Sequence, residues 1–206
     1  MSASQINIAV LVSGGGTNLQ ALIDAEQRGT LHSGRLALVV SNKPEVFALT
    51  RAEKAGIPTA VVSKAQLGQA GMEARMEQLF TEHGIGLIVL AGFLCILSPE
   101  FTRRYDHRII NIHPSLIPAF CGAGFYGLRV HEAALAKGVK VTGATVHYVN
   151  EIPDGGEIIL QKAVAVREND TPETLQKRVM RLAEWKLLPA AAELVSEKLL
   201  KTESNA

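Results

Sequence analysis

Asn111 and His113 are of types that suit chemistry at a carbonyl carbon, and they stand two positions apart in a short apolar run. Side chains two apart in a strand point to the same face of a sheet, so both would face one layer. Pro114 favours an extended backbone at His113 and would end the strand there. An amide beside an imidazole can hold a carbonyl oxygen and carry a proton, which is typical of a transfer site. By spacing alone, a turn-closing asparagine and a strand-capping histidine are an equally good interpretation.

A glycine-rich segment at 13–18, Ser-Gly-Gly-Gly-Thr-Asn, follows the first apolar run and precedes a helical pattern. Free backbone N–H groups at a helix start favour an anion, and glycine lets the backbone approach it closely. Thr17 and Asn18 can cap the helix and donate to the oxygens of a phosphate monoester. Leu19 stands where a dinucleotide fingerprint needs its third glycine, so a nicotinamide cofactor is not expected. An ordinary tight turn is the alternative, but three consecutive glycines favour the anion site.

Asp154 lies in a Pro-Asp-Gly-Gly turn between two later apolar runs. If this turn folds over the strand that carries His113, the carboxylate would reach the imidazole, raise its pKa and keep it protonated. A protonated His113 would be the better donor to a developing oxyanion. Aspartate before glycine is also ordinary turn chemistry, and the dipeptide by itself favours that interpretation.

These side chains need a scaffold, and alternating apolar runs and helical segments predict one. The strand-like runs cover residues 6–12, 35–41, 58–62, 86–91 and 108–112. Runs separated by helices are typical of a parallel sheet covered on both faces, and right-handed crossovers then give a doubly wound α/β fold. His113 would lie at the carboxyl edge of this sheet, where such folds bind ligands.

The C-terminal part of the chain has a different pattern. Runs at 144–149 and 158–166, joined by a glycine-containing turn, predict an antiparallel hairpin at the end of the sheet. A long final helix would start at Asp170 or Thr171. Pro189 should kink this helix or break it in two.

Length and composition limit the functional class. The 206 residues suit one domain with a polar tail at 201–206, and a net charge of +1 gives no general attraction to nucleic acid. No apolar run approaches the roughly 20 residues that span a bilayer, and the polar start at 1–5 does not resemble a secretory signal. A cytoplasmic protein without a membrane partner is therefore expected. Cys95 and Cys121 lack the spacing of a disulfide framework or a metal site, and no metal is expected.

Six segments taken together resemble the phosphoribosylglycinamide formyltransferase family, over about residues 6–188. They read Ser-Gly-Gly-Gly-Thr-Asn-Leu-Gln at 13–20, Ser-Asn-Lys at 41–43, Leu-Ala-Gly-Phe at 90–93, Ile-Leu-Ser-Pro at 96–99, Asn-Ile-His-Pro-Ser-Leu-Ile-Pro at 111–118 and Asp-Gly-Gly at 154–156. The resemblance implies transfer of the formyl group of 10-formyltetrahydrofolate to the primary amine of glycinamide ribonucleotide, in purine biosynthesis. It also implies a single Rossmann-like formyltransferase domain at 1–206, with a phosphate-binding half at about 1–105 and a folate-binding, catalytic half at about 106–200.

Matching positions imply roles for individual residues. The catalytic set would be Asn111, His113 and Asp154. The phosphate of the substrate would be bound by Gly16, Thr17 and Asn18, and Glu184 would reach its ribose or glycinamide end. The folate pocket would be formed by Leu94, Cys95, Ile96, Leu97, Asn111, Val149, Asn150 and Glu151.

Three positions depart from the family pattern. Many relatives place an arginine after the third strand to meet the glutamate tail of the folate, where this chain offers only Gln69 or Lys64 as substitutes. Cys95 stands where relatives often have arginine. The segment 120–127, Phe-Cys-Gly-Ala-Gly-Phe-Tyr-Gly, is longer than the corresponding family loop, and a mobile flap and a purely structural loop are both open interpretations.

Other enzymes that use 10-formyltetrahydrofolate share an Asn, His and Asp set, so they are the nearest alternatives. They include methionyl-tRNA formyltransferase, formyltetrahydrofolate hydrolase and sugar-nucleotide formyltransferases. The length and the near-neutral charge of this chain disfavour them. A non-catalytic folate or nucleotide binding module is a second alternative, which an intact catalytic set disfavours. The expected assembly is a monomer or a weak homodimer.

Overall fold

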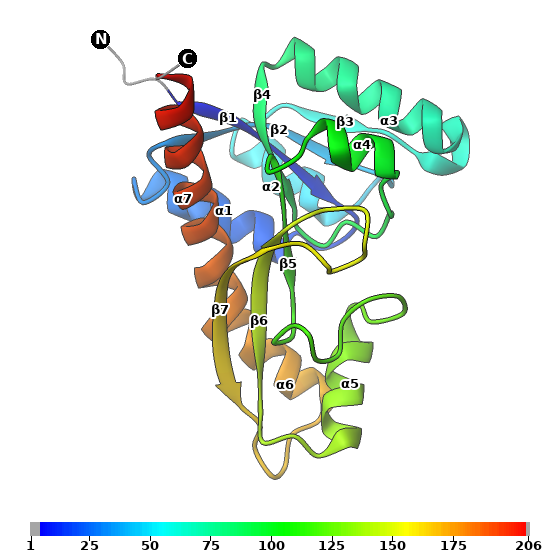
Figure 1. Ribbon diagram of the computed structural model, residues 1–206, viewed down its shortest axis with the longest axis vertical. Coiled ribbons are helices and arrows are strands. Elements are labelled where there is room, and N and C mark those ends of the chain that lie inside the picture. Colours follow the sequence, from blue (N-terminus) through cyan, green and yellow to red (C-terminus); the bar gives the residue numbers. More distant parts are fainter. Residues whose placement is uncertain (1–4, 205–206) are drawn as a thin grey trace.

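A seven-stranded mixed sheet forms the centre of the protein in the computed structural model, which describes residues 5–204 (Figure 1). Its strands are β1 (Ile6–Val12), β2 (Gly34–Ser41), β3 (Thr59–Val61), β4 (Ile85–Leu90), β5 (Ile109–His113), β6 (Val141–Tyr148) and β7 (Ile158–Ala165). They lie in the order β3-β2-β1-β4-β5-β6-β7. The first five strands run parallel, and β6 and β7 form an antiparallel hairpin beside β5. The prediction of a doubly wound, mostly parallel sheet with a terminal hairpin is confirmed.

Helices cover both faces of the sheet. They are α1 (Thr17–Gln27), α2 (Phe47–Lys54), α3 (Lys64–Glu82), α4 (Pro99–Arg104), α5 (Leu128–Lys137), α6 (Pro172–Val179), a π-helix (Met180–Glu184) and α7 (Trp185–Glu203). One face packs against α1, α2 and the C-terminal helices, and the other face packs against α3 and α4. Alternate residues of β1 supply the two cores: Ile8 and Val10 join the first, Ala9 and Leu11 the second. Because both faces are covered, the strand reads as a continuous apolar run.

The sheet has a switch point beside β1. The chain adds β2 and β3 on one side of β1, and then returns to place β4 on the other side. Open α/β sheets bind ligands outside the carboxyl ends of two such strands. The loops 13–18 and 91–98 meet there, because the backbone N–H of Leu94 donates a hydrogen bond to Oγ of Ser13 at 2.8 Å. The two loops are therefore held next to each other.

Of the two outcomes expected at Pro189, a kink or a break of the final helix, the break is wrong. Thr171 begins α6 with a capping box, as expected, but α7 runs through Pro189 as one helix. Loss of one backbone donor does not break this helix, because its inner face, which includes Leu188 and Ala191, is completely buried. The departure from α geometry lies one turn earlier, in the π-helix Met180–Glu184. Single π turns are frequent at functional sites, and this one carries Glu184.

The structure describes the chain from residue 5 to residue 204, so it covers most of the expected C-terminal tail but little of the polar start. Helix α7 continues to Glu203, so part of the expected polar tail is helical, whereas residues 205–206 lie outside the described residues. Most of the polar N-terminal start also lies outside them, at 1–4. Within residues 5–204, no helix is both long enough and apolar enough to cross a membrane.

Candidate active site

Strand β5 brings Asn111 and His113 to the carboxyl edge of the sheet. His113 is the last residue of β5, and Asn111 is paired with His147 of the antiparallel neighbour β6. The Nδ2 atom of Asn111 lies 3.2 Å from Nε2 of His147. The Nδ1 of His147 donates to the backbone oxygen of Tyr148 at 2.7 Å, which leaves Nε2 as the acceptor. Asn111 therefore donates to His147, and this hydrogen bond fixes the orientation of its amide.

Asp154 reaches both residues from the turn after β6. Its Oδ2 lies 3.5 Å from Nδ1 of His113, and its Oδ1 lies 3.5 Å from both Nδ2 of Asn111 and Nε2 of His147. The backbone N–H of Gly122 donates to Oδ2 at 2.8 Å. Asp154 has a positive φ of 56°, so the turn takes the left-handed conformation that aspartate tolerates better than most residues. The three residues that the sequence analysis grouped as catalytic thus meet in space.

The protonation of His113 differs from the sequence prediction. The imidazole is only 4% exposed, and burial lowers its pKa below the ordinary value. The charge of Asp154 and a hydrogen bond to the backbone of Phe120 raise the pKa, but they do not offset burial. Burial would raise the pKa of Asp154, but its contacts with His147, His113 and the backbone N–H of Gly122 bring it below the ordinary value. Burial thus outweighs the carboxylate, and the net shift of the His113 pKa is downward, opposite to the rise that the sequence analysis expected from Asp154.

The loop 120–127 packs directly on this group. The backbone oxygen of Phe120 accepts a hydrogen bond from Nε2 of His113 at 2.9 Å, so this nitrogen carries a proton. The adjoining Gly122 is the residue that donates to Asp154. Phe120 and all three glycines of the loop have positive φ. The sequence analysis did not foresee the Phe120 contact, because a backbone carbonyl leaves no signal in residue type. The peptide bond between Ile117 and Pro118, just before the loop, is cis.

A cavity of about 130 Å³ opens beside the three residues and matches the expected folate pocket in most of its walls. Seven of the expected residues line it: Cys95, Ile96, Leu97, Asn111, Val149, Asn150 and Glu151. Asp154 and His147 line it as well. Leu94 does not, because its backbone is tied to Ser13 and its side chain is exposed. The cavity therefore joins an apolar wall to the polar groups at the end of β5.

Gln69 lies outside this lining but supports it. Its Nε2 donates to the backbone oxygen of Ile96 at 3.2 Å and also to Glu73. Glu73 in turn accepts from the backbone N–H and the hydroxyl of Ser98, each at 2.7 Å. These bonds connect α3 to the loop that forms the apolar wall. Gln69 is thus occupied by the protein itself, and Lys64, at the start of α3, is also absent from the cavity wall.

The loop 13–18 is held open at the start of α1. Gly16 caps α1 in the left-handed conformation, with a φ of 70°, and a Cβ there would lie 2.7 Å from Cβ of Ala48. The backbone oxygen of Gly14 accepts from the N–H of Ala48, and that of Gly15 accepts from Nε of Arg51 at 2.9 Å. These contacts use only carbonyl oxygens of the loop. The first N–H groups of α1, which have no partner within the helix, therefore stay available to an anion. The sequence reasoning did not single out Arg51.

Glu184 is brought to this loop from the far end of the chain. Nδ2 of Asn18 donates to Oε2 of Glu184 at 2.8 Å, and both side chains are buried. Burial raises the pKa of Glu184 to about 7, although the bond from Asn18 acts in the opposite direction. The structure thus joins two residues that only the family resemblance had linked.

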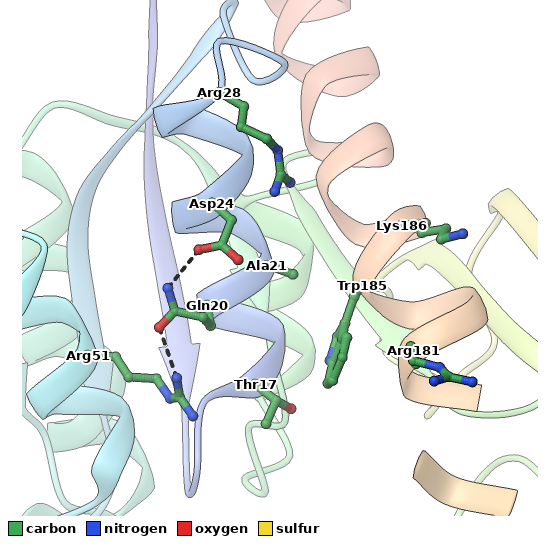
Figure 2. A pocket seen from close by; sticks show the side chains of 9 residues that line it. All are labelled: Thr17, Gln20, Ala21, Asp24, Arg28, Arg51, Arg181, Trp185 and Lys186. Carbon is green, nitrogen blue, oxygen red and sulfur yellow. Dashed lines mark hydrogen bonds between the residues drawn. The ribbon is translucent and has the colours of Figure 1, made fainter. Parts of the chain in front are cut away.

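A second cavity, of about 400 Å³, lies between α1 and the C-terminal helices (Figure 2). Its lining includes Thr17 at the start of α1 and Arg181 of the π-helix across the opening. Arg181 stands three positions before Glu184, and a charge at that spacing gives no sequence signal of its own. Within the described part of the chain, no three His, Cys, Asp or Glu side chains are grouped as a metal site would require.

Known proteins resemble the chain along most of its length. Residues 6–192 match the formyl transferase family. The chain is 44% identical over 199 residues to the trifunctional purine biosynthetic protein adenosine-3 of Bos taurus, a match that covers 96% of this chain but 19% of that protein. The chain therefore spans about a fifth of that relative. It is 38% identical to the phosphoribosylglycinamide formyltransferase of Haemophilus influenzae, covering 96% of this chain and 91% of that protein.

A solved structure shares both the sheet and its helices. The crystal structure of glycinamide ribonucleotide transformylase 1 from Symbiobacterium toebii matches with a TM-score of 0.87 at 38% identity, covering 94% of this chain and 89% of that chain. The resemblance read from six sequence segments is thereby confirmed. The family model, the relative from Haemophilus influenzae and the solved structure all agree. The chain belongs to the formyl transferase family.

Proposed function

We propose that this protein transfers the formyl group of 10-formyltetrahydrofolate to the primary amine of glycinamide ribonucleotide, a step of purine biosynthesis. The observation that carries the proposal is that Asn111 and Asp154 line the cavity with the apolar wall, while His113 contacts Asp154 directly behind it. The full-length relative and the solved structure named above both carry this activity in their names.

The cavity fits a folate by its chemistry. Cys95, Ile96 and Leu97 offer a mostly apolar wall, and the backbone of Val149–Glu151, which also lines the cavity, can bond the edge of a pterin ring. Ile96 and Ile152 are strongly exposed at the mouth, which suits an aromatic ligand that covers them. Because Gln69 bonds Ile96, we propose that it shapes the pocket rather than binding the glutamate tail.

The residues at the end of β5 act on the formyl carbon. 10-Formyltetrahydrofolate supplies a formyl group bonded to N10. The acceptor amine attacks the formyl carbon and displaces N10 from it. One hydrogen of the Asn111 amide is used by His147, and the other lies towards Asp154 at 3.5 Å, so it can donate to the oxygen on which negative charge develops. Because burial lowers its pKa, His113 can act in its neutral form and take the proton that the amine loses, and Asp154 then stabilises the resulting imidazolium. The same proton then leaves with N10, which restores the neutral ring.

The acceptor would be held at the start of α1. Its phosphate would meet the free N–H groups of Gly16, Thr17 and Asn18, where the helix dipole favours an anion. Arg181 faces the same opening and can add a positive charge. Glu184, bonded to Asn18, can accept from a ribose hydroxyl or from the glycinamide.

Several wider features belong to the same proposal. One formyltransferase domain would combine the phosphate-binding half at about 1–105 and the folate-binding half at about 106–200. The protein would act as a monomer or a weak homodimer. Because the acceptor and the folate are both water-soluble, we place the reaction in the cytoplasm.

The decisive experiment mixes purified protein with 10-formyl-dideazafolate and glycinamide ribonucleotide, and follows release of the deformylated folate by absorbance. Release that requires the nucleotide is expected. Release without the nucleotide would identify a hydrolase and overturn the proposal. No release in either mixture, from protein shown by circular dichroism to be folded, would overturn it in favour of a binding role.

A further inference from the structure

The cavity between α1 and the C-terminal helices, hereafter the cationic groove, is larger than the proposed acceptor phosphate needs. Its lining residues are Thr17, Gln20, Ala21, Asp24, Arg28, Arg51, Arg181, Trp185 and Lys186. Four of these are cations and one is a carboxylate. Its volume of about 400 Å³ lies in the range of small-molecule sites. The groove therefore has the size and the charge of an anion site.

Most of the positive charge in the cationic groove is not neutralised by the protein. Asp24 and Arg51 both bond to Gln20, at 2.8 Å and 2.9 Å, as Figure 2 shows. Over residues 5–204, no carboxylate forms an ion pair with Arg28, Arg181 or Lys186. Four cations line this hollow against the single carboxylate of Asp24, and such an excess of positive charge creates a local potential that attracts anions.

The cations are spread along the groove. Figure 2 shows Arg51 and Arg181 near Thr17, and Arg28 and Lys186 farther along the two helices. Thr17 and Arg28 are eleven positions apart, which is about 16 Å along a helix. A phosphate monoester at the start of α1 can use only the near pair. A ligand that also reached the far pair, Arg28 and Lys186, would carry a second negatively charged group.

Trp185 gives the groove an aromatic wall. Its indole points from the start of α7 towards Thr17 on α1 (Figure 2), and the residue is 37% exposed. An exposed indole beside arginine and lysine is a surface on which nucleobases stack. The groove thus combines a stacking surface near Thr17 with phosphate-binding charge farther away.

We propose that the cationic groove is a second ligand site that binds a nucleoside di- or triphosphate. The base lies on Trp185, and the phosphates lie against Arg28 and Lys186. Because the base then occupies the space beside Thr17, the nucleotide competes with the phosphate of the acceptor. The groove overlaps the proposed position of the acceptor phosphate, but it does not include Asn111, His113 or Asp154, so nucleotide binding does not require formyl transfer.

The test uses the fluorescence of Trp185, which is the only tryptophan of the chain. The protein is titrated with ADP or ATP, with excitation at the red edge of the indole band, where adenine does not absorb. We expect a saturable change that weakens with added salt, because the cations are solvent-accessible. The absence of a saturable change in the millimolar range would overturn the proposal.

Variants then locate the site. The double variant Arg28→Ala/Lys186→Ala should bind ATP at least tenfold more weakly and keep its turnover in the absence of ATP. The control Arg167→Ala/Lys137→Ala removes two exposed cations outside the groove and should bind ATP normally. Equal affinities in the two double variants would overturn the assignment of the phosphates.

Three further ligands test the orientation. AMP should bind much more weakly than ATP, because it does not reach the far pair of cations, and equal affinity would contradict the placement of the phosphates. Inorganic tripolyphosphate should displace ATP only weakly, and displacement at equal concentration would contradict stacking on Trp185. Glycinamide ribonucleotide should raise the apparent Kd for ATP, and an unchanged Kd would contradict the overlap at Thr17. A protein that binds ATP but transfers no formyl group would leave this inference intact while overturning the proposed function.

Discussion

Asn18 and Glu184 are 166 positions apart in sequence and 2.8 Å apart in space, joined by a hydrogen bond from Nδ2 to Oε2. One residue belongs to the first turn of α1 and the other ends the π-helix before α7. The bond connects the loop of the proposed phosphate site to the C-terminal helices. Because Glu184 is buried at this junction, its ionisation affects both the stability of the protein and the proposed substrate site.

Replacement Glu184→Gln should change how stability depends on pH. The pKa of Glu184 is about 7 in the folded protein against 4.5 for an ordinary glutamate, so the folded state binds more protons between these values. The wild-type free energy of unfolding should therefore fall as pH rises from about 4.5 to 7. Glu184→Gln cannot lose a proton at this position, so its free energy of unfolding above pH 7 should exceed that of wild type by up to about 3 kcal/mol. Urea unfolding across this pH range measures the difference.

Glu132→Gln, which changes an exposed carboxylate, is the matched control and should leave the pH dependence of stability as in wild type. A Glu184→Gln protein whose stability falls with pH as steeply as wild type would show that Glu184 does not carry the effect. The same variant should raise KM for glycinamide ribonucleotide, since an amide is a weaker acceptor than a carboxylate.

Gly16→Ala should destabilise the protein and disturb the phosphate loop. Its φ of 70° is unfavourable for alanine, and the new Cβ would lie 2.8 Å from Cα of Ala48. The expected loss of unfolding free energy is about 1–3 kcal/mol. Gly14→Ala is the control, because its φ is not positive and nothing lies within 4 Å of the added Cβ. Equal unfolding midpoints in urea for the two variants would contradict the strained role of Gly16.

Arg51→Ala should weaken acceptor binding more than it slows the chemical step. Arg51 bonds the backbone oxygen of Gly15 and lies 4.7 Å above the ring of Phe47, so it fixes the loop without touching the formyl carbon. We expect KM for glycinamide ribonucleotide to rise about tenfold with kcat little changed, the sign of lost uniform binding. Gln20→Ala keeps the bond to Gly15 and should have a smaller effect. A fall in kcat without a change in KM would contradict a positioning role.

Asn111→Ala and His113→Ala should each lower kcat on the order of a hundredfold or more, because each removes a group placed at the reacting centre. Initial rates at saturating substrates measure the loss, and thermal unfolding checks that the fold is kept. His107→Ala changes a half-exposed histidine in the turn before β5 and should retain wild-type kcat. Near-normal turnover by His113→Ala would disprove the mechanism.

Asp154→Asn should lower the pKa of His113 further. The charge of Asp154 raises this pKa while burial lowers it, so without the charge burial acts unopposed. Nuclear magnetic resonance titration of the imidazole should show the midpoint at lower pH than in wild type. The acid limb of kcat/KM should move the same way if His113 is the proton acceptor. Asp106→Asn, beside His107, should leave the His113 midpoint in place, and an unchanged midpoint in Asp154→Asn would refute the coupling.

Much of the fold was predictable because local patterns carry it. The residues of β1 are apolar at every core position, and alternate ones face the two cores, so the run predicts a strand covered on both sides. The turn at Asp154 and the cap at Thr171 use residues that favour those conformations. Pro189 misled the prediction, because the buried face of α7 outweighs one lost backbone bond.

The sequence by itself determined the succession of strands along the chain, the glycine-rich loop at 13–18, and the pair Asn111 and His113, since these depend on spacing along a few residues. Only the tertiary structure decided which distant residues meet: Glu184 with Asn18, and the backbone oxygen of Phe120 with His113. It also decided the direction of the His113 pKa shift, because desolvation depends on the whole surroundings of a side chain and lowers this pKa against the effect of Asp154. The types of the site residues can therefore be read from short sequence segments, whereas their pKa values depend on packing between distant parts of the chain.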